Sequence, residues 1–367
     1  MESQLTLQPY RPTPEILKAP LPFDLFNSNG TLLMRKGAQP SEYRELLLTQ
    51  PLFRSMADSD VTDKETLQRL EAAYKSYSQL MERWCCRSDD VNNLKRLVSE
   101  LVHLCDSNSG LCVATASHLT GQSHAVRHSF ATAIVSILIG SALDWNLRRQ
   151  HTLARAALTM NLSLLPLHDE WAKARSELSG IDRGNVSRHP SLSAELLIHS
   201  PGIDVSWISA VDQHHENLDG SGYPLGLKAR DICSEAKVLR VADTWCALVL
   251  LRSGRPRKTP RDALSEMSRA VGVAFDAHIF NALKKLMGNY PPGTFVRLAN
   301  RETAIIVHWD KKDGAPKYAT SIVSSNGDMP RAPRVRSLTK YGFGIREYTH
   351  LNMAQMARFS VENILSG

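Results

Sequence analysis

Residues 214–224 read HHENLDGSGYP: two adjacent histidines and an acid, followed by a glycine-rich turn that ends in Tyr-Pro. Neutral imidazole is the commonest nitrogen ligand of divalent metals in proteins. Gly220 and Gly222 permit positive φ and expose backbone N–H groups, and Pro224 fixes the exit of the turn. The stretch indicates either a simple tight turn or a metal-bearing site beside a loop that borders a phosphate ligand or a partner.

The composition is that of a folded protein of two or three units, with 43% hydrophobic and 22% charged residues in a chain of 367. Lys and Arg outnumber Asp and Glu by 44 to 37, which favours anionic partners without identifying one. Basic residues do not alternate with aromatic residues in a block, so we expect no nucleic-acid partner.

The six cysteines form no CxxC pair, which suits reduced thiols in a cytoplasm. The N-terminus lacks a basic-then-apolar signal peptide, and the longest apolar run, FATAIVSILIGSAL at 130–143, is short for a membrane span. We therefore expect a cytoplasmic protein without a membrane span.

Apolar residues at three- and four-residue spacing predict an all-α core. Two short apolar stretches around Asn29-Gly30 indicate a β-hairpin near the N-terminus, and TFVRLANRETAIIVHWD at 294–310 is β-rich. The expected fold is mainly α, with small β-containing units at both ends. Its expected parts are a small N-terminal β-containing module at 1–55, connecting helices at 56–105, a helical domain at 106–290 and a C-terminal β-unit with a short terminal helix at 291–367, the helix at 351–365.

Three further residues have the context of metal ligands. His128 begins the apolar stretch HSFATAIVSILIG, and His189 precedes Pro190 at an expected helix start. Asp243 lies in the apolar helix around RVADTW, where a buried carboxylate needs an ion-pair partner or a cation. A structural salt bridge is the alternative for Asp243. Helices that each bring one ligand inward can assemble a metal centre inside a bundle.

The motif HHENLDGSGYP resembles the signature of the HD-GYP domain, the cyclic di-GMP phosphodiesterase branch of the HD superfamily. The resemblance continues through HPSLSAELLIHSPGI at 189–203, EAKVLRVADTWCALV at 235–249 and FDAHIFNALKKL at 275–286, so it covers approximately 106–290. It implies an HD-GYP-type helical bundle that holds two or three metal ions, often iron or manganese, against a phosphodiester.

The resemblance also assigns site residues. The metal ligands it implies are His128, His189, His214, His215 and Asp243, with His124 as an additional candidate one helical turn before His128. The ligand-binding residues it implies are Gly220, Gly222 and Tyr223 of the loop together with Arg255 and Lys258, and Arg252 competes for the same phosphate-contacting role.

The pair that defines the superfamily is missing. Where relatives have His-Asp, AALTMNLSLLPL at 156–167 places Met160 and Asn161. A neutral amide removes negative charge between two cations, and methionine is a soft ligand for hard metals. His168-Asp169 spells the dipeptide eight residues later, outside the matching register, and we interpret it as coincidence. We expect a weakened two-metal centre, with a single divalent ion at His189, His214 and His215.

These features leave three functions open. The favoured one is a degenerate HD-GYP signalling protein that binds cyclic di-GMP, or docks GGDEF-type diguanylate cyclases through its GYP loop, with little or no hydrolysis. The alternative is a metal-dependent phosphodiesterase that opens cyclic di-GMP to pGpG or GMP with a reduced centre. A purely structural docking platform is the third. The resemblance implies control of motility or biofilm formation.

Overall fold

The computed structural model describes residues 7–10, 21, 25–26, 32–34, 38, 52–55, 63–84, 88–119, 123–165, 180–250, 257–307, 309, 314–329, 334–340, 342–351 and 355. The chain divides into two compact units, Met1–Glu65 and Thr66–Gly367.

The N-terminal unit contains a four-stranded antiparallel sheet. Its strands are β1 (Leu7–Tyr10), β2 (Leu25–Phe26), β3 (Leu32–Met34) and β4 (Leu52–Ser55), in the order β1-β4-β2-β3. Strands β2 and β3 pair across the segment that holds Asn29-Gly30, which itself lies outside the described residues. A small core of Leu21, Leu25 and Leu52 lies beneath the sheet residues.

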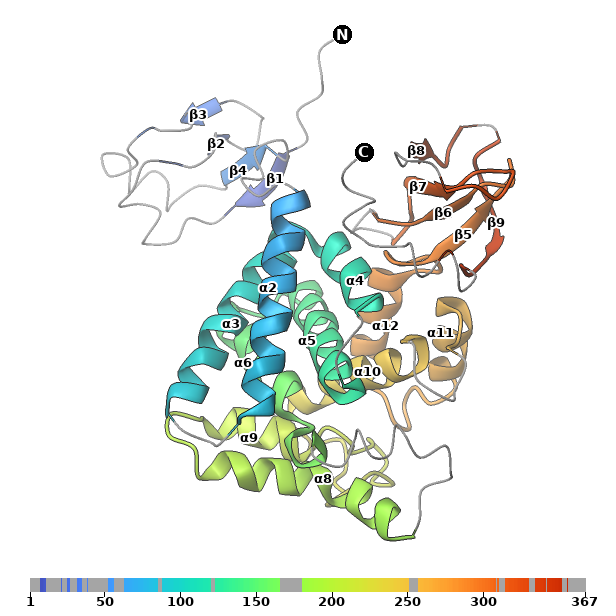
Figure 1. Ribbon diagram of the computed structural model, residues 1–367. Helices are drawn as coiled ribbons and strands as arrows, with labels where there is room; N and C mark the ends of the chain where they lie inside the picture. The colour runs from blue at the N-terminus through green and yellow to red at the C-terminus, as the bar shows by residue number, and fades with distance from the viewer. Residues whose placement is uncertain are drawn as a thin grey trace. The chain divides into compact units, whose positions relative to one another are not determined.

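Helices form most of the second unit (Figure 1). They are α2 (Asp63–Glu82), α3 (Ser88–Ser107), α4 (Ser109–Ser117), α5 (His124–Ala142), α6 (Leu147–Thr159), the short 3₁₀ helix η4 (Leu162–Leu164), α8 (Gly180–Ile198), α9 (Val205–Asp212), α10 (Ser234–Val249), α11 (Pro260–Ser268) and α12 (Ala277–Met287). Several of them begin where a polar side chain accepts a hydrogen bond from the first turn, which fixes the start of the helix. These capping residues are Asn108, Ser123, Asn146, Asp204, Thr259 and Asp276.

Helix α5 occupies the middle of the bundle and contacts α3, α4, α6, α10 and α12. Apolar side chains surround it on all sides, as expected for a helix buried in a core. By length and composition α5 is also a candidate membrane span, but 83% of its apolar window is buried inside the protein. Its packing against five helices accounts for that composition.

Helices α2 and α3, which the sequence indicates as connecting helices, pack into the same core. Leu70 and Tyr77 of α2 and Leu94 and Leu101 of α3 belong to the main buried cluster. The Tyr77 hydroxyl donates a hydrogen bond of 2.7 Å to the carbonyl oxygen of Leu158 in α6. This bond holds α2 against the helix that leads into the Met160-Asn161 segment.

A five-stranded antiparallel sheet follows the helices. Its strands are β5 (Phe295–Leu298), β6 (Thr303–Ile305), β7 (Tyr318–Val323), β8 (Arg334–Ser337) and β9 (Ile345–Tyr348), in the order β8-β7-β6-β5-β9. One face of the sheet packs onto Leu67 of α2 and Leu111 of α4. All but two residues of the predicted terminal helix, 351–365, lie outside the described residues.

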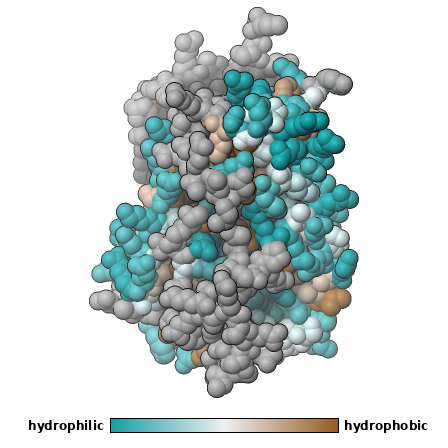
Figure 2. Space-filling model, turned by 45° about the vertical axis from the view of Figure 1, so that its right-hand side comes forward, coloured by the Kyte–Doolittle hydropathy of each residue, from teal (hydrophilic) through white to brown (hydrophobic). Residues whose placement is uncertain are grey.

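The predicted fold class, mainly α with small β-units, is confirmed. On the face drawn in Figure 2 the described residues are mainly hydrophilic, and hydrophobic areas are small and separate. The apolar residues have therefore gone largely into the cores, as the composition predicts.

A partly buried histidine joins the helices to the C-terminal sheet. The His118 ring packs on Phe295 with ring centroids 4.9 Å apart, and its Nε2 donates to the carbonyl oxygen of Gly293 at 2.8 Å. Burial lowers the pKa of His118 to about 4. The folded protein therefore holds this ring neutral over a pH range in which the unfolded chain protonates it.

We predict that His118 makes the protein acid-sensitive. Between pH about 6.5 and about 4 the unfolded state binds one more proton at this residue, so the free energy of unfolding falls as pH decreases, by up to about 3 kcal/mol. Urea unfolding of the wild type and of His118→Asn at both ends of this range measures the effect. The variant should lose less stability on acidification. Equal losses in the two proteins, or a smaller loss in the wild type, would contradict the assignment; the exposed His278→Asn is the control.

Candidate metal centre

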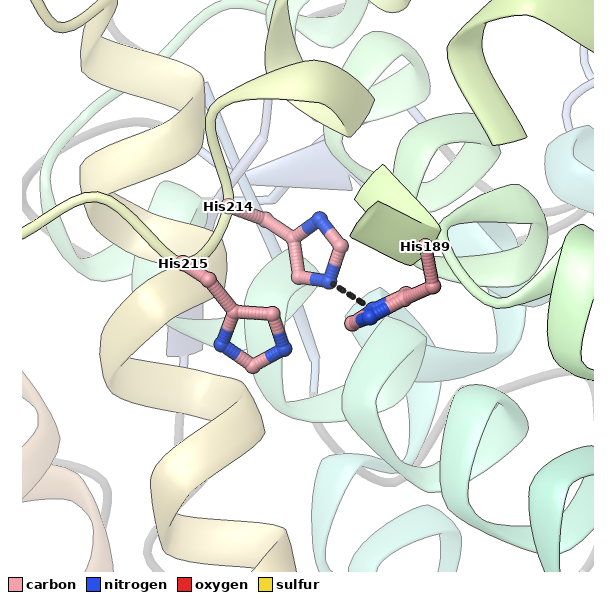
Figure 3. Close-up of side chains that lie close together, drawn as sticks. All are labelled: His189, His214 and His215. Carbon is pink, nitrogen blue, oxygen red and sulfur yellow. Dashed lines mark hydrogen bonds between the residues drawn. The ribbon is translucent and has the colours of Figure 1, made fainter. Parts of the chain in front are cut away.

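Three histidines of the helical bundle converge on one point (Figure 3). Ring nitrogens of His189, His214 and His215 all lie within 4.8 Å of one another, and this is the one such group of metal-ligating side chains among the described residues. His189 comes from α8, and the other two follow the end of α9. The structure thus brings together the three residues expected to hold a single ion.

The position of His189 before Pro190 predicts that it lies at a helix start, but it lies inside a helix. Helix α8 begins at Gly180 and carries Pro190 in its interior. Proline has no backbone N–H, so the carbonyl of Val186, four residues earlier, loses its helical partner. The His189 Nδ1 bonds to that carbonyl oxygen at 2.5 Å. Because a carbonyl only accepts, Nδ1 carries the proton and Nε2 points into the cluster with its lone pair.

His214 is oriented in the same way by a different helix end. Its Nδ1 donates to the carbonyl oxygen of Val211 at 2.6 Å. Val211 lies in the last turn of α9, where carbonyls have no partner within the helix. The Nε2 atoms of His214 and His189 face each other at 3.1 Å. Two lone pairs at this distance repel each other unless a cation lies between them.

Burial keeps the cluster free of protons. Desolvation, followed by the neighbouring His189, lowers the pKa of His214 to about 3. Burial also lowers the pKa of His189, and it holds that of His215 well below its ordinary value. Neither ring nitrogen of His215 makes a hydrogen bond to a described residue. Three neutral imidazoles with inward nitrogens fit a divalent metal ion, and hydrogen bonds from the opposite ring nitrogens are the usual support of metal-bound histidines.

The two remaining predicted ligands pair with each other. His128 Nε2 donates to Asp243 Oδ1 at 2.7 Å, and both residues are buried. Burial acts to raise the pKa of Asp243, but the hydrogen bond from His128 and the electrostatic interaction with it outweigh burial. The pKa of Asp243 is therefore lowered, and the group stays anionic. Asp243 is also close to His214 and His215, and its negative charge partly offsets the lowering of their pKa values by burial. His124 stacks on His128 with ring centroids 5.8 Å apart.

Met160 and Asn161, which stand where the family resemblance places His-Asp, provide no charged ligand. Met160 is fully buried and belongs to the main hydrophobic cluster. Asn161 donates from its amide nitrogen to the Ser129 hydroxyl at 3.3 Å, next to His128. Two residues later, Ser163 donates to α8 twice, from its hydroxyl to the His189 carbonyl oxygen at 3.1 Å and from its backbone N–H to the Ser193 hydroxyl at 3.2 Å. The segment therefore packs α8 in place without offering a carboxylate.

A buried glutamate that the sequence analysis did not single out shapes the glycine loop. Glu216 accepts hydrogen bonds from three consecutive backbone N–H groups, those of Leu225, Gly226 and Leu227, at 2.6, 3.1 and 2.9 Å. Because its oxygens are taken up by the loop, Glu216 serves as an anchor and not as a metal ligand. Only its place after the two histidines hints at this role in the sequence.

The loop has to contain glycine where the motif has it. A Cβ at Gly222 would lie 2.3 Å from the backbone nitrogen of Asn217, and Gly220 has φ +87°. Tyr223, which precedes a cis peptide bond to Pro224, stacks on His215 with centroids 4.7 Å apart. Burial, followed by the charge of Asp243, raises the pKa of Tyr223 to about 12, so its hydroxyl remains a hydrogen-bond donor.

A cation without a role in the sequence motif lies beside the loop and the histidine cluster. Arg240, one helical turn before Asp243 in α10, donates from Nε to Asn217 at 3.1 Å and from Nη1 to Thr244 at 2.8 Å. Its charge lowers the pKa values of His214 and His215. Arg240 retains further N–H donors, as its guanidinium carries five.

Of the predicted phosphate-contacting residues, the structure describes Lys258. Lys258 pairs with Glu266 of α11 through an Nζ to Oε2 distance of 2.9 Å. Arg252 and Arg255 lie outside the described residues, as do His168 and Asp169.

Comparison with known proteins identifies the fold that carries this site. The family model of the HD domain matches residues 107–279. The chain therefore contains an HD domain that is similar to those of HD-GYP proteins. It is 24% identical over 223 residues to a cyclic di-GMP phosphodiesterase of Pseudomonas aeruginosa, covering 61% of this chain and 54% of that protein. It is 22% identical to the cyclic di-GMP phosphodiesterase PdeB of Borreliella burgdorferi, covering 63% and 61%.

A solved structure, an HDG"Y"P protein from Bdellovibrio bacteriovorus, is 17% identical with a TM-score of 0.49 over 76% of this chain and 98% of that chain. The HD-domain chain spans 54% and 61% of the two curated relatives that it matches.

We predict that Pro190 supports metal binding through His189. Pro190→Ala returns an N–H that competes for the Val186 carbonyl, so the affinity for Zn²⁺ or Mn²⁺ should fall about tenfold or more in calorimetry, with no loss of helix stability. Pro260→Ala, in the first turn of α11 where no carbonyl is deprived, is the control and should bind as the wild type does. Unchanged affinity in Pro190→Ala would contradict this role.

We also predict one tightly held divalent ion per chain. Protein purified without chelator and analysed by plasma mass spectrometry should contain a single ion, which His214→Ala removes and the exposed His278→Ala retains. Two ions per chain, or an ion that persists in His214→Ala, would show that the three histidines are not the site.

Proposed function

We propose that this protein is a degenerate HD-GYP signalling protein that binds cyclic di-GMP at its three-histidine site with little or no hydrolysis. The single observation that carries the proposal is the placement of Met160 and Asn161. One is fully buried among apolar side chains, and the other is an amide bonded to Ser129. Neither supplies the anionic bridge between two cations that the superfamily pattern implies.

Electrostatics explains why this substitution matters. Two divalent ions about 4 Å apart repel each other strongly, and carboxylate ligands between them offset that repulsion. Asp243 is the one buried carboxylate that pairs with a predicted ligand histidine among the described residues, and its Oδ1 is taken by His128. A single ion at His189, His214 and His215 needs no such bridge, because neutral imidazoles are sufficient ligands.

The metal identity remains part of the proposal. Imidazole nitrogen suits iron and zinc better than manganese, which favours oxygen ligands. Of the two metals that the resemblance implies, iron therefore fits this all-nitrogen set better. When bound, the ion would supply positive charge to a phosphate oxygen of the ligand.

Ligand-binding groups support recognition of a phosphodiester. Arg240 has N–H donors left over beside the cluster, and the Tyr223 hydroxyl remains a donor above the loop. The curated relatives are named cyclic di-GMP phosphodiesterases, which supports cyclic di-GMP as the ligand. Docking of a diguanylate cyclase through the loop anchored by Glu216 is the other mode of signalling that we propose for this site.

An active enzyme with a reduced centre is the second candidate. The observation that favours it is the intact three-histidine cluster with Asp243 nearby, which could activate water next to one ion. Its products would be pGpG or GMP. The two candidates differ in turnover and not in binding.

We predict that metal-replete protein binds cyclic di-GMP in calorimetry and yields almost no pGpG or GMP in chromatography. Restoring the two ligands with Met160→His and Asn161→Asp should raise hydrolysis at least about a hundredfold, because the bridging carboxylate returns. The paired control is Met160→Leu with Asn161→Gln, which alters the same positions without adding a ligand. Rapid turnover by the wild type would favour the second candidate, and absence of binding would contradict both.

A further inference from the structure

A second pocket lies on the other side of α10 from the histidine cluster. It is an open pocket, with about 570 Å³ of empty space that includes solvent, where α4 and α10 meet the start of α11 and the ends of β5 and β9. The whole pocket belongs to the unit Thr66–Gly367.

The geometry of α10 separates the two sites. Trp245 and Val249 line the pocket, whereas Arg240 and Asp243 face the histidines. At 100° per residue, Trp245 lies about 200° around the helix from Asp243. None of the three clustered histidines lines the pocket.

The pocket contains an arginine without an acidic partner. Arg257 is half-buried and donates from Nη2 to His350 Nδ1 at 3.0 Å, and it has no carboxylate within ion-pair distance among the described residues. Lys258 lies beside it and pairs with Glu266. The described residues that line the pocket include no aspartate or glutamate. A half-buried guanidinium without an anionic partner loses part of its hydration, and a bound anion would offset that cost.

The remaining lining suits a ligand with one charged end. The hydroxyls of Thr294 and Thr349 make no hydrogen bond to a described residue, so both can donate to anion oxygens. The opposite wall is apolar and aromatic, formed by Trp245, Met287 and Phe295. Ligand pockets commonly combine an apolar wall with a few polar groups that fix orientation.

We propose that this pocket binds a small organic phosphate with a flat, apolar or aromatic body. Arg257 holds the phosphate with two parallel N–H donors, Thr294 and Thr349 donate to its free oxygens, and Trp245 and Phe295 contact the body. Phosphate is favoured over carboxylate because a phosphate that pairs two oxygens with the Arg257 guanidinium keeps further oxygens for the two hydroxyls, whereas a carboxylate has no third oxygen. The ligand would connect the helices to the C-terminal sheet. The proposal does not depend on binding of cyclic di-GMP.

The test titrates the full chain with phenyl phosphate in a calorimeter. We expect saturable binding that weakens about tenfold or more in Arg257→Gln and less in Arg257→Lys, which keeps the charge but loses the fork. His214→Ala, which removes the metal site, should bind as the wild type does. Benzyl alcohol, the neutral analogue, should not bind.

Thermal unfolding of each variant confirms that it is folded, and phenyl phosphate should raise the Tm of the wild type but not that of Arg257→Gln. Three results would overturn the proposal: no saturable binding to the wild type, equal affinity in Arg257→Gln, or binding that disappears in His214→Ala. Tighter binding of benzoate than of phenyl phosphate would overturn the choice of phosphate.

Discussion

Two imidazole nitrogens that face each other without a proton between them are the constraint on which this site depends. The Nε2 atoms of His189 and His214 lie 3.1 Å apart, and both Nδ1 atoms donate to backbone carbonyls. Burial holds the rings neutral, so protonation does not relieve the repulsion near neutral pH. A divalent cation between the rings removes the repulsion and uses both lone pairs, with His215 as the third ligand.

This constraint arises from two helix carbonyls that lack a backbone hydrogen-bond partner. Pro190 deprives the Val186 carbonyl of a partner, and the last turn of α9 leaves the Val211 carbonyl open. Each free carbonyl takes the Nδ1 proton of a nearby histidine. The anchor carboxylate of Glu216 then fixes the loop that places Tyr223 against His215. Opposite this loop, Asp243 is paired with His128, so the bundle retains a negative charge near the cluster without lending it a bridging ligand.

Much of this arrangement follows from the sequence, and the rest depends on tertiary contacts. His189, His214 and His215 are predictable because the His-Pro and His-His pairs stand beside a helix-breaking residue and a glycine turn. The mainly α fold follows from apolar spacing along helices such as α5. The interior position of Pro190 is not predictable, because proline usually marks a helix start, and here the packing of Ser163 against α8 supports the helix on both sides of it.

The roles of Glu216 and Arg240 cannot be predicted from the motif, because their partners are backbone N–H groups and side chains that come together only in the folded loop. The same reason hides the pocket around Arg257, whose walls come from segments more than a hundred residues apart. Met160 and Asn161 are visible in the sequence as residues that stand where the family resemblance places His-Asp, but the packing of Met160 into the main core depends on the fold.

Anomalous diffraction from metal-replete crystals of the wild type would locate the bound ion. We expect one anomalous peak within bonding distance of His189, His214 and His215, and no peak between His128 and Asp243. Two neighbouring peaks, with Asp243 or Asn161 coordinated between them, would contradict it.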